Sequence, residues 1–425
     1  MSLLIKGGRV IDPATNTDEI MDILLEKGEI KKISKNIDSC EETLNASGKI
    51  VSPGLIDMHT HLREPGREDE ETIQSGTYAA ARGGFTTICC MPNTTPTIDN
   101  PSVVKFIYEK ARKEGIIEVL PIGAISKERK GEELSEMGRM WKAGVVAFSD
   151  DGNWVENTYL MRRALEYVKM FNLPLISHCE DKTLSQDGVM NEGYFSTILG
   201  LKGIPREAEE VAIFRDITLS KMTGSPLHVA HLSSAGSVKL IEQAKKSGIK
   251  VSAEVTPHHF TLTEKEVTSF NPNTRVNPPL RGEKDLIALK EGLKNEIIEV
   301  IATDHAPHSQ EEKESDYVSA PFGIIGLETA LSLVIKELVE KKVLSLIQAL
   351  SKLTINPARI LKIDRGRIKE GAKANLVIFD LNKNWVVRKE DFLSKSKNSP
   401  FIGWTLPGVV EWTIFEGRIV YRNTK

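Results

Sequence analysis

Cysteine is scarce in this sequence, and its spacing excludes one class of metal site. Only four of the 425 residues are cysteine, at positions 40, 89, 90 and 179, and none belongs to a CxxC pair of the kind that holds structural zinc. Cys89 and Cys90 are neighbours in a strand-like apolar run, so we expect them to serve as small buried side chains. A metal site in this chain would therefore use other residue types.

Long apolar runs and a strong net charge are also absent. No run approaches the ~20 apolar residues of a membrane-spanning helix, and residues 1–8 lack the apolar core of a signal peptide. The net charge is −3, and charged residues of both signs make up 27% of the chain, so neither nucleic acid nor an anionic membrane is an expected partner. We expect a soluble, cytoplasmic protein.

The residue pattern changes twice along the chain. Residues 1–52 contain short strand patterns and turn signals, without a helix of normal length. Residues 53–365 alternate apolar strands with amphipathic helical segments, and residues 366–425 return to strands. The segment 412–421 resembles the segment 4–11 near the other end. We therefore expect both ends of the chain to contribute to one small β domain beside a central α/β domain.

Eight apolar segments of the central domain are strand candidates, and amphipathic stretches separate most of them. Apolar strands joined by helical crossovers pair in parallel, and eight of them favour a closed (β/α)8 TIM barrel. An open doubly wound sheet is the alternative, but no glycine-rich GxGxxG turn follows the first strand. The eight candidates are residues 50–61, 85–93, 117–125, 144–151, 174–179, 226–232, 249–258 and 298–305.

Ionisable side chains gather where these strands end, which is where a TIM barrel carries its chemistry. A single histidine in an apolar strand is usually a buried structural residue, but a group at one end of several strands indicates a metal site. Histidine and carboxylate ligands without thiolate suit zinc or a similar divalent ion. The group is too large for one tetrahedral ion, so two ions are expected. Its members are His59, His61, His178, His231, Asp304 and one of the pair Asp150 and Asp151.

Other polar residues near these strand ends are expected to have different roles. Arg63 should project from the same side as the histidine pair of the first strand, where a substrate anion could bind. Strict alternation directs His228 towards the helices and His305 away from the barrel axis. His258 and His259 end the seventh strand, where either a supporting or a purely structural role is open.

Two signatures make this chain resemble the amidohydrolase superfamily and, within it, the bacterial type I dihydroorotase family. Residues 57–65 (DMHTHLREP) match the first signature, and residues 302–308 (ATDHAPH), with Lys313 five residues beyond, match the second. Residues 398–401 also resemble the C-terminal region of that family. The resemblance covers essentially the whole chain and implies an α/β fold, a TIM barrel with a small β-sandwich domain built from both termini.

The resemblance also implies a reaction, a metal centre and a substrate site. The reaction is the reversible, zinc-dependent hydrolysis of dihydroorotate to N-carbamoyl-L-aspartate in pyrimidine biosynthesis. Two zinc ions are implied, one held by His59, His61 and Asp304 and the other by His178 and His231. We also expect a homodimer, with aspartate transcarbamoylase as a partner. The implied substrate-binding residues are His61, Arg63, Asn93, Asn277, His308 and the backbone at Phe322 and Gly323.

One position departs from the wider superfamily pattern. Many members bridge their two metal ions with a carbamylated lysine at the end of strand four, but residues 144–151 contain no lysine. The type I family is similar to this sequence in having aspartate there, so Asp151 is the expected bridge, together with a hydroxide. Asp304 is expected to be catalytic, accepting the proton of the hydroxide and passing it to the leaving nitrogen.

Two other functions stay open. Another cyclic amidohydrolase, such as a dihydropyrimidinase, hydantoinase or allantoinase, acts on a substrate without the ring carboxylate that Arg63 would hold. A catalytically silent relative would act as a binding subunit, although every expected ligand is present.

Overall fold

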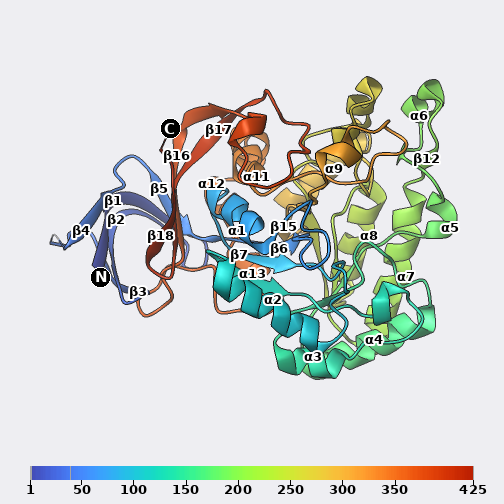
Figure 1. Ribbon diagram of the computed structural model, residues 1–425, viewed down its shortest axis with the longest axis horizontal. Coiled ribbons are helices and arrows are strands. Elements are labelled where there is room, and N and C mark those ends of the chain that lie inside the picture. Colours follow the sequence, from blue (N-terminus) through green and yellow to red (C-terminus); the bar gives the residue numbers. More distant parts are fainter. Residues whose placement is uncertain (1, 39, 425) are drawn as a thin grey trace.

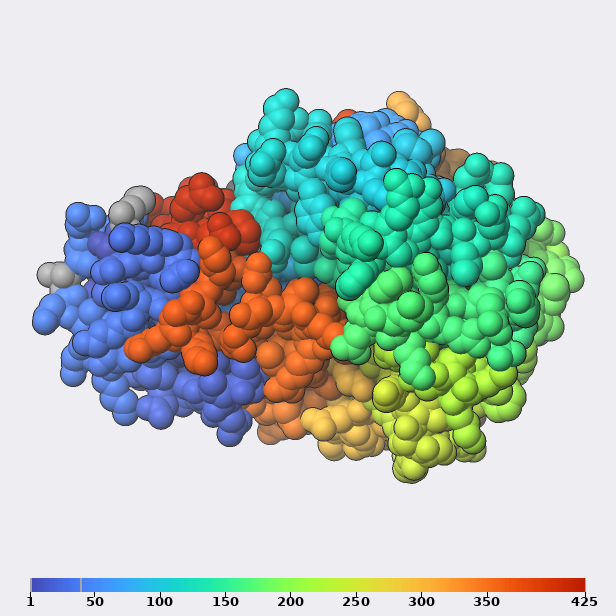
Figure 2. Space-filling model, turned by 90° about the horizontal axis from the view of Figure 1, so that it is seen from below, coloured from blue at the N-terminus to red at the C-terminus, as the bar shows by residue number. Residues whose placement is uncertain are grey.

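The computed structural model describes residues 2–38 and 40–424, which form a β-sheet unit at one end of the molecule and a barrel unit at the other (Figure 1). Seen from another side, residues of the C-terminal part (orange and red) lie between the N-terminal strands (blue) and the barrel (Figure 2). Among the described residues, no helix has the length and apolar character needed to cross a membrane.

The predicted TIM barrel is confirmed. Its eight strands pair in parallel in chain order. Parallel bridges join Gly123 to Phe148 and Thr60 to His305, so the last strand meets the first and the barrel is closed. The strands are β6 (Leu55–Thr60), β7 (Phe85–Cys90), β8 (Glu118–Pro121), β9 (Phe148–Ser149), β10 (Leu175–Ser177), β13 (Leu227–Val229), β14 (Val251–Val255) and β15 (Val300–Ile301).

The strands are shorter than predicted, and at their C-terminal ends the polar residues leave the ladder. The predicted segments 144–151 and 298–305 contain only the two-residue strands β9 and β15. His231 (φ +32°) and Asp304 (φ +49°) adopt a left-handed backbone just beyond the ends of β13 and β15. Extended pairing cannot continue through such residues, so their side chains point in directions that simple alternation does not give.

Alternate strand residues face two different apolar layers, as a packed barrel requires. Met58, Cys89 and Ile176 belong to the cluster inside the barrel. Ile88 and Val255 belong to the larger cluster between the strands and the surrounding helices. The prediction that Cys89 and Cys90 are small buried side chains is confirmed, since both are fully buried.

The helices around the barrel follow ordinary local rules, as α2 (Pro101–Glu114) illustrates. Asn100 caps its first turn by accepting hydrogen bonds from the backbone N–H groups of residues 102 and 103, and proline occupies the first helical position. The other helices are α1 (Ile73–Arg82), α3 (Met137–Ala143), α4 (Thr158–Phe171), α5 (Lys182–Ser185), α6 (Tyr194–Leu199), α7 (Glu207–Thr223), α8 (Ala235–Lys246), α9 (Glu283–Lys294), α10 (Gln310–Lys313), α11 (Ala330–Val334), α12 (Leu346–Ser351) and α13 (Ile355–Leu361). The pair β11 (Met190–Asn191) and β12 (Gly203–Ile204) lies outside the barrel.

Both ends of the chain contribute to one eight-stranded sheet, as predicted, in the order β18-β17-β16-β5-β1-β2-β3 with β4 paired to β1. Strand β5 joins the two ends, since it lies parallel to β1 and antiparallel to β16. Inward side chains of both ends, including Ile5, Leu25 and Ile378, form one core. The strands are β1 (Ser2–Asp12), β2 (Thr17–Glu26), β3 (Glu29–Ser34), β4 (Glu42–Asn45), β5 (Ile50–Pro53), β16 (Leu376–Val386), β17 (Thr405–Phe415) and β18 (Arg418–Arg422).

Gly54 is the single residue between the last N-terminal strand of the sheet unit and the first strand of the barrel. It separates β5, which ends at Pro53, from β6, which begins at Leu55. A Cβ at Gly54 would lie 2.2 Å from Oγ1 and 2.3 Å from Cγ2 of the buried Thr86. The division of the chain at 52/53 and 365/366 stays a prediction, and Pro53 still belongs to β5.

We predict that Gly54→Ala lowers the free energy of unfolding by about 1–3 kcal/mol, because the added methyl group overpacks against Thr86. Chemical denaturation measures the loss. Thr86→Ala removes both nearest atoms, so the double variant should recover much of it in a double-mutant cycle. Strictly additive losses would contradict this account of the junction.

Candidate metal centre

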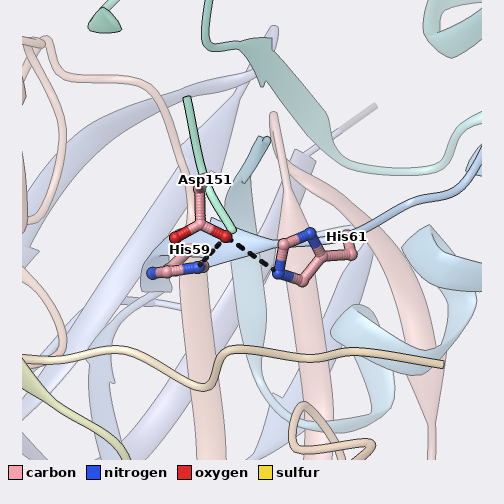
Figure 3. A group of neighbouring side chains, drawn as sticks. All are labelled: His59, His61 and Asp151. Carbon is pink, nitrogen blue, oxygen red and sulfur yellow. Dashed lines mark ion pairs between the residues drawn. The ribbon is translucent and has the colours of Figure 1, made fainter. Parts of the chain in front are cut away.

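Two histidines of the first strand and Asp151 of the fourth form one side of a buried polar cluster (Figure 3). Oδ2 of Asp151 lies 3.3 Å from Nε2 of His59 and 3.5 Å from Nε2 of His61. Oδ1 of Asp304 lies 2.9 Å from the same nitrogen of His61 and 3.4 Å from that of His59. Two imidazoles and two carboxylates therefore face one small volume, which we call the first ligand group.

The other oxygen of Asp151 faces a second ligand group. Oδ1 lies 3.6 Å from Nδ1 of His178 and 3.5 Å from Nε2 of His231. These two nitrogens lie 2.8 Å apart. Asp151 thus presents one oxygen to each pair of histidines, the position expected of a bridging carboxylate.

The side chains of the two ligand groups do not satisfy all of their polar atoms by hydrogen bonds to one another, and divalent cations would do so. Nε2 of His59 and Oδ1 of Asp151 are buried without a hydrogen-bond partner among the described residues. A buried polar atom without a partner costs free energy, and a cation in each ligand group would satisfy one of these two atoms. Nitrogen and carboxylate oxygen donors without sulfur suit zinc and similar ions. The residues present therefore fit two metal ions.

The electrostatic setting keeps the bridging carboxylate ionised. Burial by itself would raise the pKa of Asp151, but His59, His178 and His231 outweigh that effect and hold the pKa well below its ordinary range. Burial and the facing histidines act on Asp304 in the same way, and its pKa also falls below the ordinary value. Both groups are anionic at neutral pH, which a metal ligand requires.

The neighbouring Asp150 points elsewhere, as alternate residues of an extended segment do. Its Oδ1 accepts hydrogen bonds from the backbone N–H groups of Ile125 (2.8 Å) and Ser126 (3.0 Å), and its Oδ2 accepts one from the Ser126 hydroxyl. Asp150 therefore holds the loop after β8, while Asp151 faces the histidines.

Two further carboxylates hold the outer nitrogens of the histidines, and sequence reasoning missed both. Oε1 of Glu254 lies 2.6 Å from Nδ1 of His59. Oε2 of Glu180 lies 3.2 Å from Nε2 of His178 and accepts a hydrogen bond from Asn277 at 2.9 Å. Carboxylates placed behind metal-binding histidines fix the ring orientation and raise its basicity. A carboxylate inside the apolar strand 251–255 was the available signal for Glu254.

The expectation that His228 points towards the helices is wrong. Its Nε2 lies 3.1 Å from Oε2 of Glu254, and its Nδ1 lies 2.8 Å from Oγ of Ser252, so it shares the inner face of the barrel with those residues. The error comes from counting back from His231, whose left-handed backbone breaks the alternation. His228 and Ser252 therefore extend the support behind His59.

His258, His259 and His305 also lie outside the two ligand groups. Nε2 of His305 contacts Glu71 at 3.3 Å, away from the centre, as predicted. His259 contacts the Thr256 hydroxyl at 2.7 Å and the Pro278 carbonyl at 2.9 Å, so its contacts support a structural role. His258 packs against the His259 ring.

The residues expected to bind substrate form contacts around this centre. Oδ1 of Asn93 lies 2.8 Å from Nδ1 of His61, beside the first ligand group. Arg63 donates from Nε to the Pro307 carbonyl at 3.0 Å, and its Nη2 lies 3.3 Å from Nε2 of His308. Asn277 reaches the second ligand group through Glu180. The structure thus brings these side chains to one end of the barrel, while their contacts with substrate stay a prediction.

The backbone at Phe322 and Gly323 reaches the same region. The Phe322 carbonyl oxygen lies 2.7 Å from Nε2 of His308, and the Gly323 N–H donates to the Arg275 carbonyl at 2.9 Å. Asn398 holds this segment, donating to the Gly323 carbonyl at 3.1 Å and accepting from the His308 N–H at 3.2 Å. The C-terminal segment 398–401 therefore supports the barrel mouth.

Comparisons with known proteins agree with the geometry. Family models described as "Dihydro-orotase-like" and "Amidohydrolase family" match residues 48–237 and 323–421. A protein named dihydroorotase from Endomicrobium trichonymphae is 54% identical over 99% of this chain and 100% of its own length. A dihydroorotase from Pelotomaculum thermopropionicum is 54% identical over 100% of this chain and 99% of its own. The solved structure of an L-hydantoinase (dihydropyrimidinase) from Arthrobacter aurescens gives a TM-score of 0.90 at 26% identity, covering 100% of this chain and 96% of that one.

We predict that Asp151→Ala binds at least one metal ion fewer than the native chain, since each ligand group loses an oxygen. Metal analysis after reconstitution with Zn2+ and dialysis measures the stoichiometry. Asp150→Ala is the matched control and should keep both ions, although its thermal midpoint should fall because it leaves backbone N–H groups without their acceptor. The reverse pattern of metal content would show that Asp150 is the bridge.

Proposed function

The chain belongs to the dihydroorotase family of metal-dependent amidohydrolases, and we propose that it opens the ring of dihydroorotate to N-carbamoyl-L-aspartate, reversibly, at a two-zinc centre. The observation that carries this proposal is the full-length 54% identity to proteins of that name, in a chain whose expected ligand side chains all meet at one barrel end. Zinc is proposed because the donors are histidine and carboxylate only. A homodimer, an aspartate transcarbamoylase partner and a cytoplasmic location are proposed on the resemblance and the sequence.

The protein side chains proposed to hold the ions are those of the two ligand groups. His59, His61 and Asp304 would hold one ion, His178 and His231 the other, and Asp151 would bridge them. When bound, the ions supply an activated water and polarise the carbonyl of the scissile amide.

Asp304 is proposed to move the proton. One of its oxygens, Oδ1, faces His61 at 2.9 Å, which leaves Oδ2 to accept a proton from the attacking water and pass it to the departing ring nitrogen. The depressed pKa keeps Asp304 ionised and ready to accept that proton at neutral pH. In ring closure the same oxygen would return the proton.

Arg63 and His308 are proposed to bind the substrate carboxylate, with Asn93 nearby. Nε of Arg63 is occupied by the Pro307 carbonyl, which leaves the outer guanidinium nitrogens for an anion. A planar, permanently charged guanidinium suits a carboxylate better than an ammonium group does. The substrates of hydantoinases and dihydropyrimidinases lack this carboxylate. The likeness to such enzymes lies in the fold and at 26% identity, so it favours the superfamily rather than that substrate.

We predict that the purified, zinc-loaded protein hydrolyses dihydroorotate and that exhaustive chelation abolishes the activity, which added zinc restores. Steady-state assays at 1 mM dihydroorotate, dihydrouracil and hydantoin, a working concentration on the order of common KM values, compare the substrates. Dihydroorotate should be preferred by at least tenfold, the value of one lost charge-assisted contact. Equal or better hydrolysis of dihydrouracil would refute the substrate assignment.

Asp304→Asn should retain metal and bind substrate, because the amide oxygen can still coordinate, while kcat falls about 10²–10⁴-fold with the loss of the proton acceptor. In the native enzyme, hydrolysis should decline as pH falls towards the depressed pKa and the carboxylate becomes protonated. Metal analysis and a pH–rate profile measure both effects. A loss of activity that only parallels a loss of zinc would leave Asp304 as a ligand without a proton-transfer role.

A further inference from the structure

A second group of acidic residues and histidine lies beside the proposed substrate carboxylate site. Glu70, His308 and Glu312 place their ligand-type atoms within 4.8 Å of one another, as in a metal site. Two arginines already pair with them. Nη2 of Arg67 lies 3.1 Å from Glu70 and 2.7 Å from Glu312, and Nε of Arg63 lies 3.0 Å from Glu70. These guanidinium groups repel a cation, so the cluster has another role.

Glu70 connects the two side chains that the proposed function assigns to the substrate carboxylate. Its Oε2 lies 3.0 Å from Nε of Arg63, and its Oε1 lies 2.8 Å from Nδ1 of His308. The residue is only 1% exposed and lies in the loop between β6 and α1, so its side chain has little room for another arrangement. One buried carboxylate thus contacts both an arginine that follows strand one and a histidine that follows strand eight.

The contacts of His308 fix the position of its protons. Nε2 lies 2.7 Å from the Phe322 carbonyl oxygen, which can only accept, so this nitrogen carries a hydrogen. Nδ1 faces Glu70, and a second proton must lie between these two atoms. Burial raises the pKa of Glu70 to about 7, while burial and then Arg63 hold the pKa of His308 well below its ordinary value. In a neutral His308 that carries its hydrogen on Nε2, Nδ1 is an acceptor, so the proton between the two residues is donated by Glu70.

We propose that Glu70 is a positioning residue for substrate recognition, holding the Arg63 guanidinium and the His308 ring in the arrangement that receives the carboxylate of the substrate. The inference rests on the proposed function, because it acts through Arg63 and His308. Glu70 itself contacts neither the two ligand groups nor the proposed proton acceptor through any hydrogen bond or ion pair of the described residues.

Two substitutions at residue 70 separate loss of its contacts from replacement of its acid group. Glu70→Ala removes both contacts, so KM for dihydroorotate should rise about 10- to 100-fold, the effect of losing a charge-assisted hydrogen bond, while kcat stays within about threefold. Glu70→Gln keeps an oxygen facing Nε of Arg63 and an N–H donor for Nδ1 of His308, so its KM should stay within about threefold of native. Arg67 can turn to Asp69 and Glu312, which it already contacts.

Asp69→Ala is the matched control, because this neighbouring carboxylate is exposed. Among the described residues, its only ion pair is with Arg67. Its KM and kcat should match the native values. Thermal midpoint and zinc content are measured for every variant. A Glu70→Ala protein with native KM overturns the inference, as does one whose raised KM comes with lost zinc or a collapsed thermal midpoint. Glu70→Gln as damaging as Glu70→Ala also overturns it, since glutamine keeps the contacts to which the inference assigns the effect.

Arg63→Lys, assayed in parallel, distinguishes failure of this inference from failure of the proposed function. If Arg63→Lys raises KM and Glu70→Ala does not, the carboxylate site stands and only the role of Glu70 is wrong. If Arg63→Lys leaves KM unchanged, the carboxylate site assigned to Arg63 fails, and the role of Glu70 fails with it.

Discussion

A single buried carboxylate, Asp151, lies between two pairs of histidines, and the barrel end is arranged around it. Each of its oxygens faces two imidazole nitrogens at 3.3–3.6 Å. Such a group is unstable in a protein interior unless positive charge balances it, and a cation in each of the two ligand groups would supply that charge. The four histidines lie at or just beyond the ends of three strands. Balancing the charge of Asp151 therefore constrains the positions of the ends of β6, β10 and β13.

Around Asp151, two other carboxylates fix the orientation of histidine rings that face the centre. Glu254 holds the far nitrogen of His59, and Glu180 holds that of His178. Glu180 also accepts from Asn277, which ties the second ligand group to a residue proposed to bind substrate. An imidazole has two nitrogens, and a partner on one determines what the other can do. The carboxylates bound to the outer ring nitrogens thus determine how the inner nitrogens of His59 and His178 are presented to the site.

Much of this candidate site could be predicted from the sequence, because the ionisable residues that meet there follow apolar strands and can be found by the position of each strand end. His59, His61, His178, His231 and Asp304 all follow that rule. The rule does not extend to residues that act from inside the barrel or from a distant loop. His228 was misplaced because one left-handed residue changes the alternation. Asn398 was known only as a family motif, since its partners lie 75 and more residues away.

The fold, like the site, could be predicted only in part from the sequence. Strand order and closure followed from eight apolar segments, and the resemblance between the two ends of the chain pointed to their shared sheet. Strand lengths did not follow, because hydrogen-bond pairing stops where side chains turn towards the site. Sequence periodicity reports which face is apolar, and it carries no information on where a ladder ends.

The anchoring of the barrel mouth by Asn398 bears on how the protein is made. Residues 306–308 and 323–325 pack on a segment that the ribosome delivers after every barrel strand has been synthesised. The eight strands can therefore pair while translation is still in progress, but the mouth reaches its final form only after residue 398 emerges. Nascent chains arrested before that point would carry the histidines without the completed entrance, so completion of the mouth belongs to the last stage of biosynthesis.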